Sequence, residues 1–157
     1  MRVHREAVLR LSYAALPNML SCGGGGIINV ASIAAFLARG TYGASKAWTV
    51  SFTEAVAAEV AGSGVRVMAA CPGWVRTEYH QRAGLDASNV PSFLWLDPDT
   101  VVEATMNDFS RGPRVSLPTA KYKFLVGLSR AVPRRLAAVV SARLGSRRMG
   151  RDALRRQ

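Results

Sequence analysis

Apolar residues recur at helical spacing near the start of the chain and then give way to a short β-branched run. The first pattern predicts an amphipathic helix from Glu6 to Leu20. Its apolar positions are Val8, Leu9, Leu11, Ala15, Leu16 and Met19. Four glycines, Gly23 to Gly26, precede the run Ile27 to Val30, which predicts a buried strand. A glycine loop that binds a dinucleotide follows a strand and opens a helix, whereas here the order is reversed. We therefore expect these glycines to end a helix and begin a strand.

A second helix and a second strand follow. The segment from Thr41 to Val60 is rich in alanine and carries Trp48, Phe52 and Val56 at fourfold spacing, which predicts a long helix. The sequence AGSG then ends the helix, and the segment from Val65 to Ala70 predicts a strand. A strand, a helix and a strand at this spacing form a βαβ unit, whose two strands are parallel. The sequence therefore predicts the α/β fold class.

The C-terminal part of the chain predicts further elements. Asp97 suits the cap of a helix whose first residue is Pro98, and Arg114 to Pro118 predicts a last short strand. Beyond it, the pattern predicts two helices split at Pro133 and an Arg-rich end. We expect residues 1–118 to form the α/β core and residues 119–157 to form basic helices and a tail.

The composition is that of a folded protein, because 49% of the 157 residues are hydrophobic and 20% are charged. Cys22 and Cys71 are too few for a disulfide framework and lack the spacing of metal ligands, so no metal site is expected. Glu6 and Arg10 interrupt the apolar stretch that a signal peptide needs, and no run reaches the ~18 apolar residues of a membrane span. These features predict a cytoplasmic protein.

The positive charge is concentrated at the C-terminal end. Residues 1–110 hold eight basic and nine acidic side chains, whereas residues 111–157 hold thirteen basic side chains and one acidic one. Phe124, Leu125 and Leu128 lie on one side of this lysine-containing segment, as in an interfacial helix. For the helices we favour instead a C-terminal pair that closes over the substrate segment, followed by a solvated terminus. We expect at most a weak contact with anionic surfaces through the tail, and no specific nucleic acid.

Candidate chemistry lies at the start of the second predicted helix, in the sequence GTYGASKAW. Tyr42 and Lys46 are four residues apart, so their side chains share one face of the helix. A tyrosine with its ordinary pKa of about 10 is a poor proton donor or acceptor at neutral pH, and a nearby ammonium lowers that pKa. The pair suits general acid–base chemistry, although the same spacing is common on solvated helix faces.

Two further polar segments are expected close to Tyr42 and Lys46. Ser32 follows the first predicted strand, and the sequence CPGWVRTEY (71–79) follows the second. Ligands of open α/β sheets bind at the carboxyl ends of the strands. The segments IINVAS, YGASK and PGWVRT, in this order, resemble the short-chain dehydrogenase/reductase family, and the resemblance runs over nearly the whole chain. It implies part of a Rossmann-type, doubly wound parallel sheet.

The resemblance implies a role for each matched residue. Tyr42 would exchange a proton with the substrate oxygen, Lys46 would bind the nicotinamide ribose and lower the pKa of Tyr42, and Ser32 would hydrogen-bond the substrate. Tyr42 and Lys46 would thus also contact the cofactor, NAD or NADP, and Val75 and Thr77 would meet its carboxamide end. The implied cofactor loop contains Pro72, Gly73, Val75 and Thr77. The implied reaction is NAD(P)-dependent oxidoreduction of a carbonyl/alcohol pair.

The sequence also departs from the family. The family's glycine loop, Thr-Gly-x-x-x-Gly-x-Gly, is missing, so the resemblance covers the C-terminal portion of such an enzyme and implies a truncated form. His4 stands where the family usually carries an Asn, and the segment from Ser32 to Tyr42 is shorter than in the family. The alternative function is therefore an inactive remnant or a non-enzymatic binding module without cofactor. The first strand would also leave an open edge, which invites aggregation or pairing with another chain.

Two partners are expected besides the cofactor. The sequence SFLWLD, from Ser92 to Asp97, suggests an apolar lid and hence an apolar small-molecule substrate. The long helices are expected to join copies of the chain into a homo-oligomer.

Overall fold

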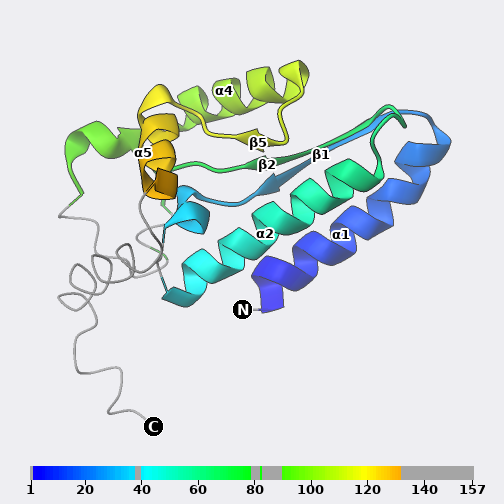
Figure 1. The fold of residues 1–157 in the computed structure, drawn as a ribbon, viewed down its shortest axis with the longest axis horizontal. Coiled ribbons are helices and arrows are strands. Elements are labelled where there is room, and N and C mark those ends of the chain that lie inside the picture. Colours follow the sequence, from blue (N-terminus) through cyan, green and yellow to red (C-terminus); the bar gives the residue numbers. More distant parts are fainter. Residues whose placement is uncertain (1, 38–39, 79–81, 83–89, 132–157) are drawn as a thin grey trace, which may run out of the picture.

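A three-stranded parallel sheet lies at the centre of the computed structural model, which describes residues 2–37, 40–78, 82 and 90–131 (Figure 1). Its strands are β1 (Gly25–Val30), β2 (Val65–Ala70) and β5 (Val115–Ser116), in the order β1-β2-β5. β1 and β2 pair in parallel along their whole length. This pairing confirms the predicted βαβ unit and the α/β class. β1 lies at the edge of the sheet among the described strands.

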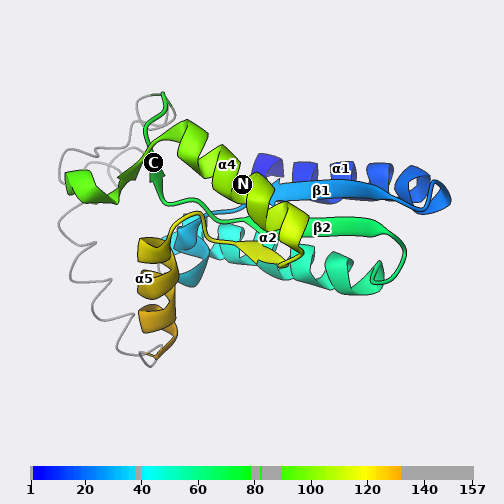
Figure 2. The same cartoon turned by 90° about the horizontal axis from the view of Figure 1, so that it is seen from above.

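Helices cover both faces of the sheet. α1 (Arg2–Ser21) and α2 (Gly40–Glu59) lie side by side on one face, and α4 (Pro98–Arg111) crosses the other (Figures 1 and 2). The 3-10 helix η1 (Ile33–Phe36) follows β1 directly, and α5 (Ala120–Ala131) packs against it. This arrangement brings η1 and α5 to the carboxyl end of β1, where the predicted site lies.

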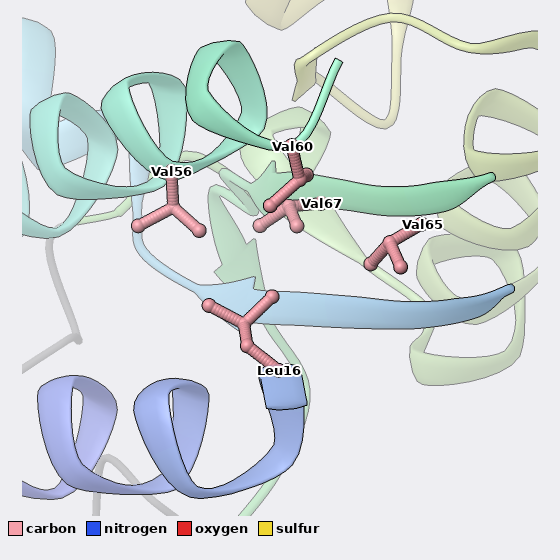
Figure 3. Packing of buried hydrophobic residues seen from close by; sticks show 5 residues of the cluster. All are labelled: Leu16, Val56, Val60, Val65 and Val67. Carbon is pink, nitrogen blue, oxygen red and sulfur yellow. The ribbon is translucent and has the colours of Figure 1, made fainter. Parts of the chain in front are cut away.

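The buried face of α1 belongs to a core cluster between the helices and the sheet (Figure 3). The buried members of this cluster are Leu16, Val56, Val60, Val65 and Val67. The predicted apolar face of α1 is only partly correct, because Leu11 is 70% exposed whereas Ser12 is 2% exposed. α1 packs mainly against α2 and β1, so it buries a narrow stripe at i, i+4 spacing, to which Ser12 and Leu16 belong.

The glycine run links α1 to β1, as predicted. Gly23 follows the helix with a φ of +65°, a left-handed conformation that is typical of glycine after a helix. Gly25 and Gly26 already belong to β1, which starts two residues earlier than the β-branched run. A Cβ atom at Gly25 would overlap Met19, and one at Gly26 would overlap Phe109. These two glycines therefore let a helix approach each face of the strand closely.

Local signals predicted several later elements correctly. α2 agrees with its predicted bounds to within one residue at either end. Asp97 caps α4, because its Oδ2 accepts the N–H groups of Asp99 at 3.0 Å and Thr100 at 3.3 Å. β5 lies inside the predicted last strand, and α5 is the first of the two predicted C-terminal helices. The second of those helices, beyond Pro133, and the Arg-rich end lie outside the described residues.

The apolar side chains of α5 divide between two faces. Leu125 packs against a core cluster with the buried Val126, whereas Phe124 is 75% exposed and Leu128 is 53% exposed. The prediction that Phe124, Leu125 and Leu128 form one interfacial side is corrected accordingly, because α5 packs against η1. No helix in the described part of the chain is long and apolar enough to cross a lipid bilayer.

A second, two-stranded sheet was not predicted. β3 (Trp74–Val75) pairs in parallel with β4 (Trp95–Leu96), which follows the 3-10 helix η2 (Ser92–Leu94). Strands of two residues are too short to show an alternating pattern, and their pairing joins distant parts of the sequence. The small sheet holds the segment after β2 beside the predicted apolar lid.

Candidate active site

Ser32 lies two residues after β1, where its hydroxyl links η1 to the loop that follows β2. The Oγ atom caps η1 by accepting the N–H of Ala34 at 3.2 Å. The hydroxyl also donates to the carbonyl oxygen of Pro72 at 3.4 Å, which is long for such a bond and therefore weak. A substrate oxygen that approached this hydroxyl could replace the Pro72 carbonyl as its acceptor.

The Lys46 side chain runs from α2 to the end of β1. Its Nζ donates to the carbonyl oxygen of Val30, the last residue of the strand, at 2.8 Å. The side chain is 9% exposed, and this burial lowers the pKa of Lys46, an effect that the nearby Cys71 partly opposes. An ammonium has three N–H donors, so two remain for other acceptors at this edge of the sheet.

Tyr42 lies one helical turn before Lys46 on the same face of α2, as predicted. The Lys46 Nζ lies 5.9 Å from the centre of the Tyr42 ring. Tyr42 is 40% exposed, so a ligand can approach its phenol from the solvent side. The exposed Tyr42 ring and the buried Lys46 amine therefore lie close together on one face of α2.

The loop after β2 carries the predicted cofactor residues. The Pro72 carbonyl accepts the backbone N–H of Ile33 at 3.0 Å, which ties the loop to η1. Val75 belongs to β3 and lies opposite Leu96 in register, and Thr77 follows two residues later in an exposed position. Ser32, the Lys46 amine and the start of this loop thus lie together at the carboxyl ends of β1 and β2.

Two buried polar residues near the site have structural roles. The Asn29 amide donates to Thr53 Oγ1 at 3.1 Å and so links β1 to α2. Burial raises the pKa of the Cys71 thiol to about 12, despite a hydrogen bond with the Ser32 backbone and the positive charge of Lys46, which act in the opposite direction. Cys71 therefore stays protonated at neutral pH and is no nucleophile.

Sequence reasoning missed Tyr122, a residue of α5 that is 1% exposed. Its hydroxyl accepts the N–H of Trp74 at 3.1 Å and donates to the carbonyl of Leu94. Burial raises the pKa of Tyr122, so the hydroxyl keeps the proton that it donates. The available signal was the spacing of Tyr122 and Val126, which places two apolar residues on one face of a helix with lysines beside it.

Some predicted features lie beyond what the structure describes. The side chain of His4, residues 38–39 between Ser32 and Tyr42, and most of the segment between Thr77 and Val90 fall outside the described residues. In the remainder, no group of three or more His, Cys, Asp and Glu side chains is placed to hold a metal ion.

Known proteins are similar to this chain in sequence. The family model described as short chain dehydrogenase matches residues 1–87, more than half of the chain. The 2-(R)-hydroxypropyl-CoM dehydrogenase of Xanthobacter autotrophicus is 45% identical over 71 residues, which make up 43% of this chain and 28% of that protein. The 3-oxoacyl-[acyl-carrier-protein] reductase FabG of Vibrio harveyi is 33% identical over 107 residues, which make up 63% of this chain and 44% of that protein.

Solved structures are similar over almost the whole chain. A short-chain dehydrogenase from Sphingobium yanoikuyae in complex with NADPH is 29% identical with a TM-score of 0.70, and the match covers 95% of this chain and 55% of that one. A short chain dehydrogenase from Burkholderia cenocepacia in complex with NADP is 27% identical with a TM-score of 0.69, and the match covers 94% and 58%. The chain thus spans a little over half the length of these structures.

Proposed function

Because this chain belongs to the short-chain dehydrogenase/reductase family, we propose that it serves NAD(P)-dependent oxidoreduction of a carbonyl/alcohol pair, with Tyr42 as the general acid/base. The observation that supports this most directly is the buried Lys46 amine, which is bonded to the end of β1 and lies 5.9 Å from the centre of the Tyr42 ring. A lysine on a solvated helix face would not be buried in this way. The arrangement suits a phenol that must lose and regain a proton near neutral pH.

Each residue of the site has a separate task in this proposal. The Tyr42 hydroxyl passes its proton to the substrate oxygen during reduction and takes it back during oxidation. Lys46 stabilises the phenolate and offers its two remaining N–H donors to a ribose. Ser32 exchanges its weak bond to Pro72 for one to the substrate oxygen, which fixes the carbonyl next to Tyr42.

The chain's residues fit the nicotinamide end of such a cofactor. The donors of Lys46 and the loop with Pro72, Gly73, Val75 and Thr77 lie at one edge of the sheet, where they would hold the ribose and the carboxamide. A bound nicotinamide would supply the hydride. Two solved structures similar to this chain are complexes with NADPH and with NADP, which supports the proposal that this chain binds NAD or NADP.

A thermal-shift titration with NADH and NADPH tests the proposal. Ligand at a hundred times its dissociation constant should stabilise the chain by about 2.7 kcal/mol, which raises the melting temperature by several degrees. Lys46→Ala should weaken this shift, whereas Lys123→Ala, the control at an exposed lysine of α5, should leave it unchanged. If binding holds, Tyr42→Phe should keep it and abolish turnover of carbonyl substrates.

The opposite result would favour the alternative function. No shift at millimolar cofactor would mean that the site keeps the family's geometry without its cofactor. The chain would then be an inactive remnant or a non-enzymatic binding module. An equal shift in the Lys46→Ala chain would instead refute the role of Lys46 in binding the cofactor.

The exposed and half-buried apolar side chains of the segment from Ser92 to Asp97 support an apolar substrate. Phe93 is 62% exposed at η2, and Leu94 and Trp95 are half-buried beside the loop after β2. These side chains offer apolar contact area near the predicted site. In a chain that binds cofactor, Phe93→Ser should raise the KM for an apolar ketone more than the KM for a small polar one, and equal effects would refute this.

A homo-oligomer formed through the long helices is proposed as well. Leu9 and Leu11 of α1 are exposed, and Tyr13, which is 53% exposed, lies against Phe52 of α2 at 6.1 Å between ring centres. Leu9 and Tyr13 are four residues apart and share one face of the helix, and exposed apolar side chains that gather on one face are typical of a contact surface. Light scattering should show an oligomer that Leu9→Glu dissociates, and a monomeric parent chain would refute the proposal.

We also propose a cytoplasmic location and a surface contact of the C-terminal tail. Cys22 and Cys71 are both free thiols, which suits a reducing compartment such as the cytoplasm, and cell fractionation tests this. The Arg-rich residues 145–157 lie outside the described residues, and we propose that they make a weak contact with anionic surfaces. Unchanged binding to anionic vesicles after their deletion would refute that contact, and we expect no specific binding to duplex DNA.

A further inference from the structure

The hydrogen bonds of the small sheet are interrupted by a side chain. The N–H of Arg76 donates to the Leu96 carbonyl at 3.0 Å, as in an ordinary parallel pair. Two residues earlier in each strand, the next bond of such a pair would join the N–H of Trp74 to the carbonyl of Leu94. Instead, the hydroxyl of Tyr122 accepts from Trp74 at 3.1 Å and donates to Leu94. The tyrosine hydroxyl thus occupies one position of the ladder and bridges the two segments.

The ring of Tyr122 is fixed in place on several sides. It belongs to a buried cluster with Ile33 of η1, Leu96 of β4 and Val126 of α5. It also lies so close to Gly73 that a Cβ atom there would overlap the ring and the hydroxyl. A ring held in this way can move little without moving the backbone at Gly73.

This contact bears directly on the predicted cofactor loop. The loop has one anchor at Pro72, whose carbonyl accepts from the Ile33 backbone and the Ser32 hydroxyl. The contact between Tyr122 and Trp74 is a second anchor two residues later. Val75 follows this second anchor immediately, so its position depends on where Tyr122 holds the chain.

We propose that Tyr122 is a positioning residue that sets the place of the loop from Gly73 to Thr77 through its hydroxyl and its ring. The hydroxyl fixes the distance between the loop and the Leu94 segment, and the ring fixes the distance between the loop and α5. That the loop then places a cofactor rests on the proposed function. The placement of the loop itself does not.

Tryptophan fluorescence tests the placement without any ligand. Trp74 and Trp95 lie 5.7 Å apart between ring centres on either side of the bridge, and Trp48→Phe removes the third tryptophan, which lies on α2. In this background Tyr122→Phe should shift the emission to the red and increase quenching by acrylamide. Thr53→Val, the matched control, removes a buried hydroxyl between β1 and α2 and should change neither. Superimposable spectra for Tyr122→Phe would overturn the proposal.

A second variant covers the case in which Tyr122→Phe does not fold. Gly73→Ala adds a methyl group that overlaps the Tyr122 ring, so it should displace the loop and also shift the Trp74 and Trp95 emission to the red. Unchanged emission in this variant would overturn the proposal as well.

Cofactor affinity separates this inference from the proposed function. If the parent chain binds NADPH, Tyr122→Phe should raise the dissociation constant roughly tenfold, because the displaced loop no longer meets the cofactor in place, while Thr53→Val leaves it unchanged. A changed emission with unchanged affinity would refute the link from loop to cofactor. A parent chain that binds no cofactor refutes the proposed function, and the fluorescence result alone then decides whether Tyr122 places the loop.

Discussion

Replacing Gly73 with alanine should destabilise the protein, although such a change usually does the opposite. Gly73 is not among the glycines with a positive φ, so its backbone conformation is open to alanine. At such positions a Gly→Ala change ordinarily stabilises by about 0.4–1 kcal/mol, because it restricts the unfolded chain. Here the added methyl group would overlap the Tyr122 ring and hydroxyl. Overpacking of this kind costs about 1–3 kcal/mol.

A double-mutant cycle assigns this cost to Tyr122. Tyr122→Leu removes the obstructing atoms, and by itself should cost about 2–4 kcal/mol through the cavity and the two backbone groups that lose their partner. In the Tyr122→Leu background Gly73→Ala no longer meets the ring. The combined cost should therefore be about 1–2 kcal/mol less than the sum of the two single costs.

Urea unfolding followed by far-UV circular dichroism measures all four chains. Gly127→Ala in α5 is the matched control, because a methyl group there meets nothing and should stabilise the helix by about 0.5–1 kcal/mol. A neutral or stabilising Gly73→Ala change, or costs that add within about 0.5 kcal/mol, would refute the contact with Tyr122 as the cause.

Three further predictions concern single groups. The exposed Cys22 thiol should react with a thiol reagent in the native chain near pH 8. The buried Cys71 thiol, whose pKa is raised from 9.0 to about 12, should react only after unfolding. Equal reaction rates for the two thiols in the native chain would contradict this prediction. Asp97→Ala removes the cap of α4 and should lower the free energy of unfolding by about 1 kcal/mol in urea titrations. Asp97→Asn keeps a capping oxygen and should be nearly neutral. An equal cost for both variants would argue against capping. Burial lowers the pKa of Lys46 below 10.5, so between the native pKa and 10.5 the unfolded chain binds more protons than the native one, and the free energy of unfolding rises with pH. Lys46→Met should remove this rise from the urea midpoints. Parallel pH curves for the parent and the Lys46→Met chain would contradict this prediction.

The parts of the fold that local sequence encodes were predicted well. α2 has a continuous helical pattern, and α4 has a capping Asp97 followed by Pro98, so both were placed from neighbouring residues alone. The pairing of Tyr42 with Lys46 follows from the geometry of one helix. By contrast, the helical pattern of α1 gave the wrong exposure for Leu11 and Ser12, because the pattern shows the spacing of apolar residues but not the width of the surface that covers them.

The candidate site shows the same division. Ser32, Lys46 and the loop after β2 were expected together, since each follows or faces the end of a parallel strand. The small sheet and Tyr122 were not expected. Trp74, Leu94 and Tyr122 come from three separate segments, and nothing in the neighbourhood of any one of them indicates the other two.

By itself, the sequence determined the α/β class, the βαβ unit, the placement of Tyr42 and Lys46 on one face of α2 and the family to which the chain belongs. These depend on periodicity, capping and short motifs, which act over a few residues. Only the tertiary structure decided that the Lys46 amine is buried against Val30, that Cys71 stays protonated, and that Tyr122 bridges the loop after β2 to the Leu94 segment. Burial and hydrogen bonds between distant segments arise when the chain packs, so no local pattern records them.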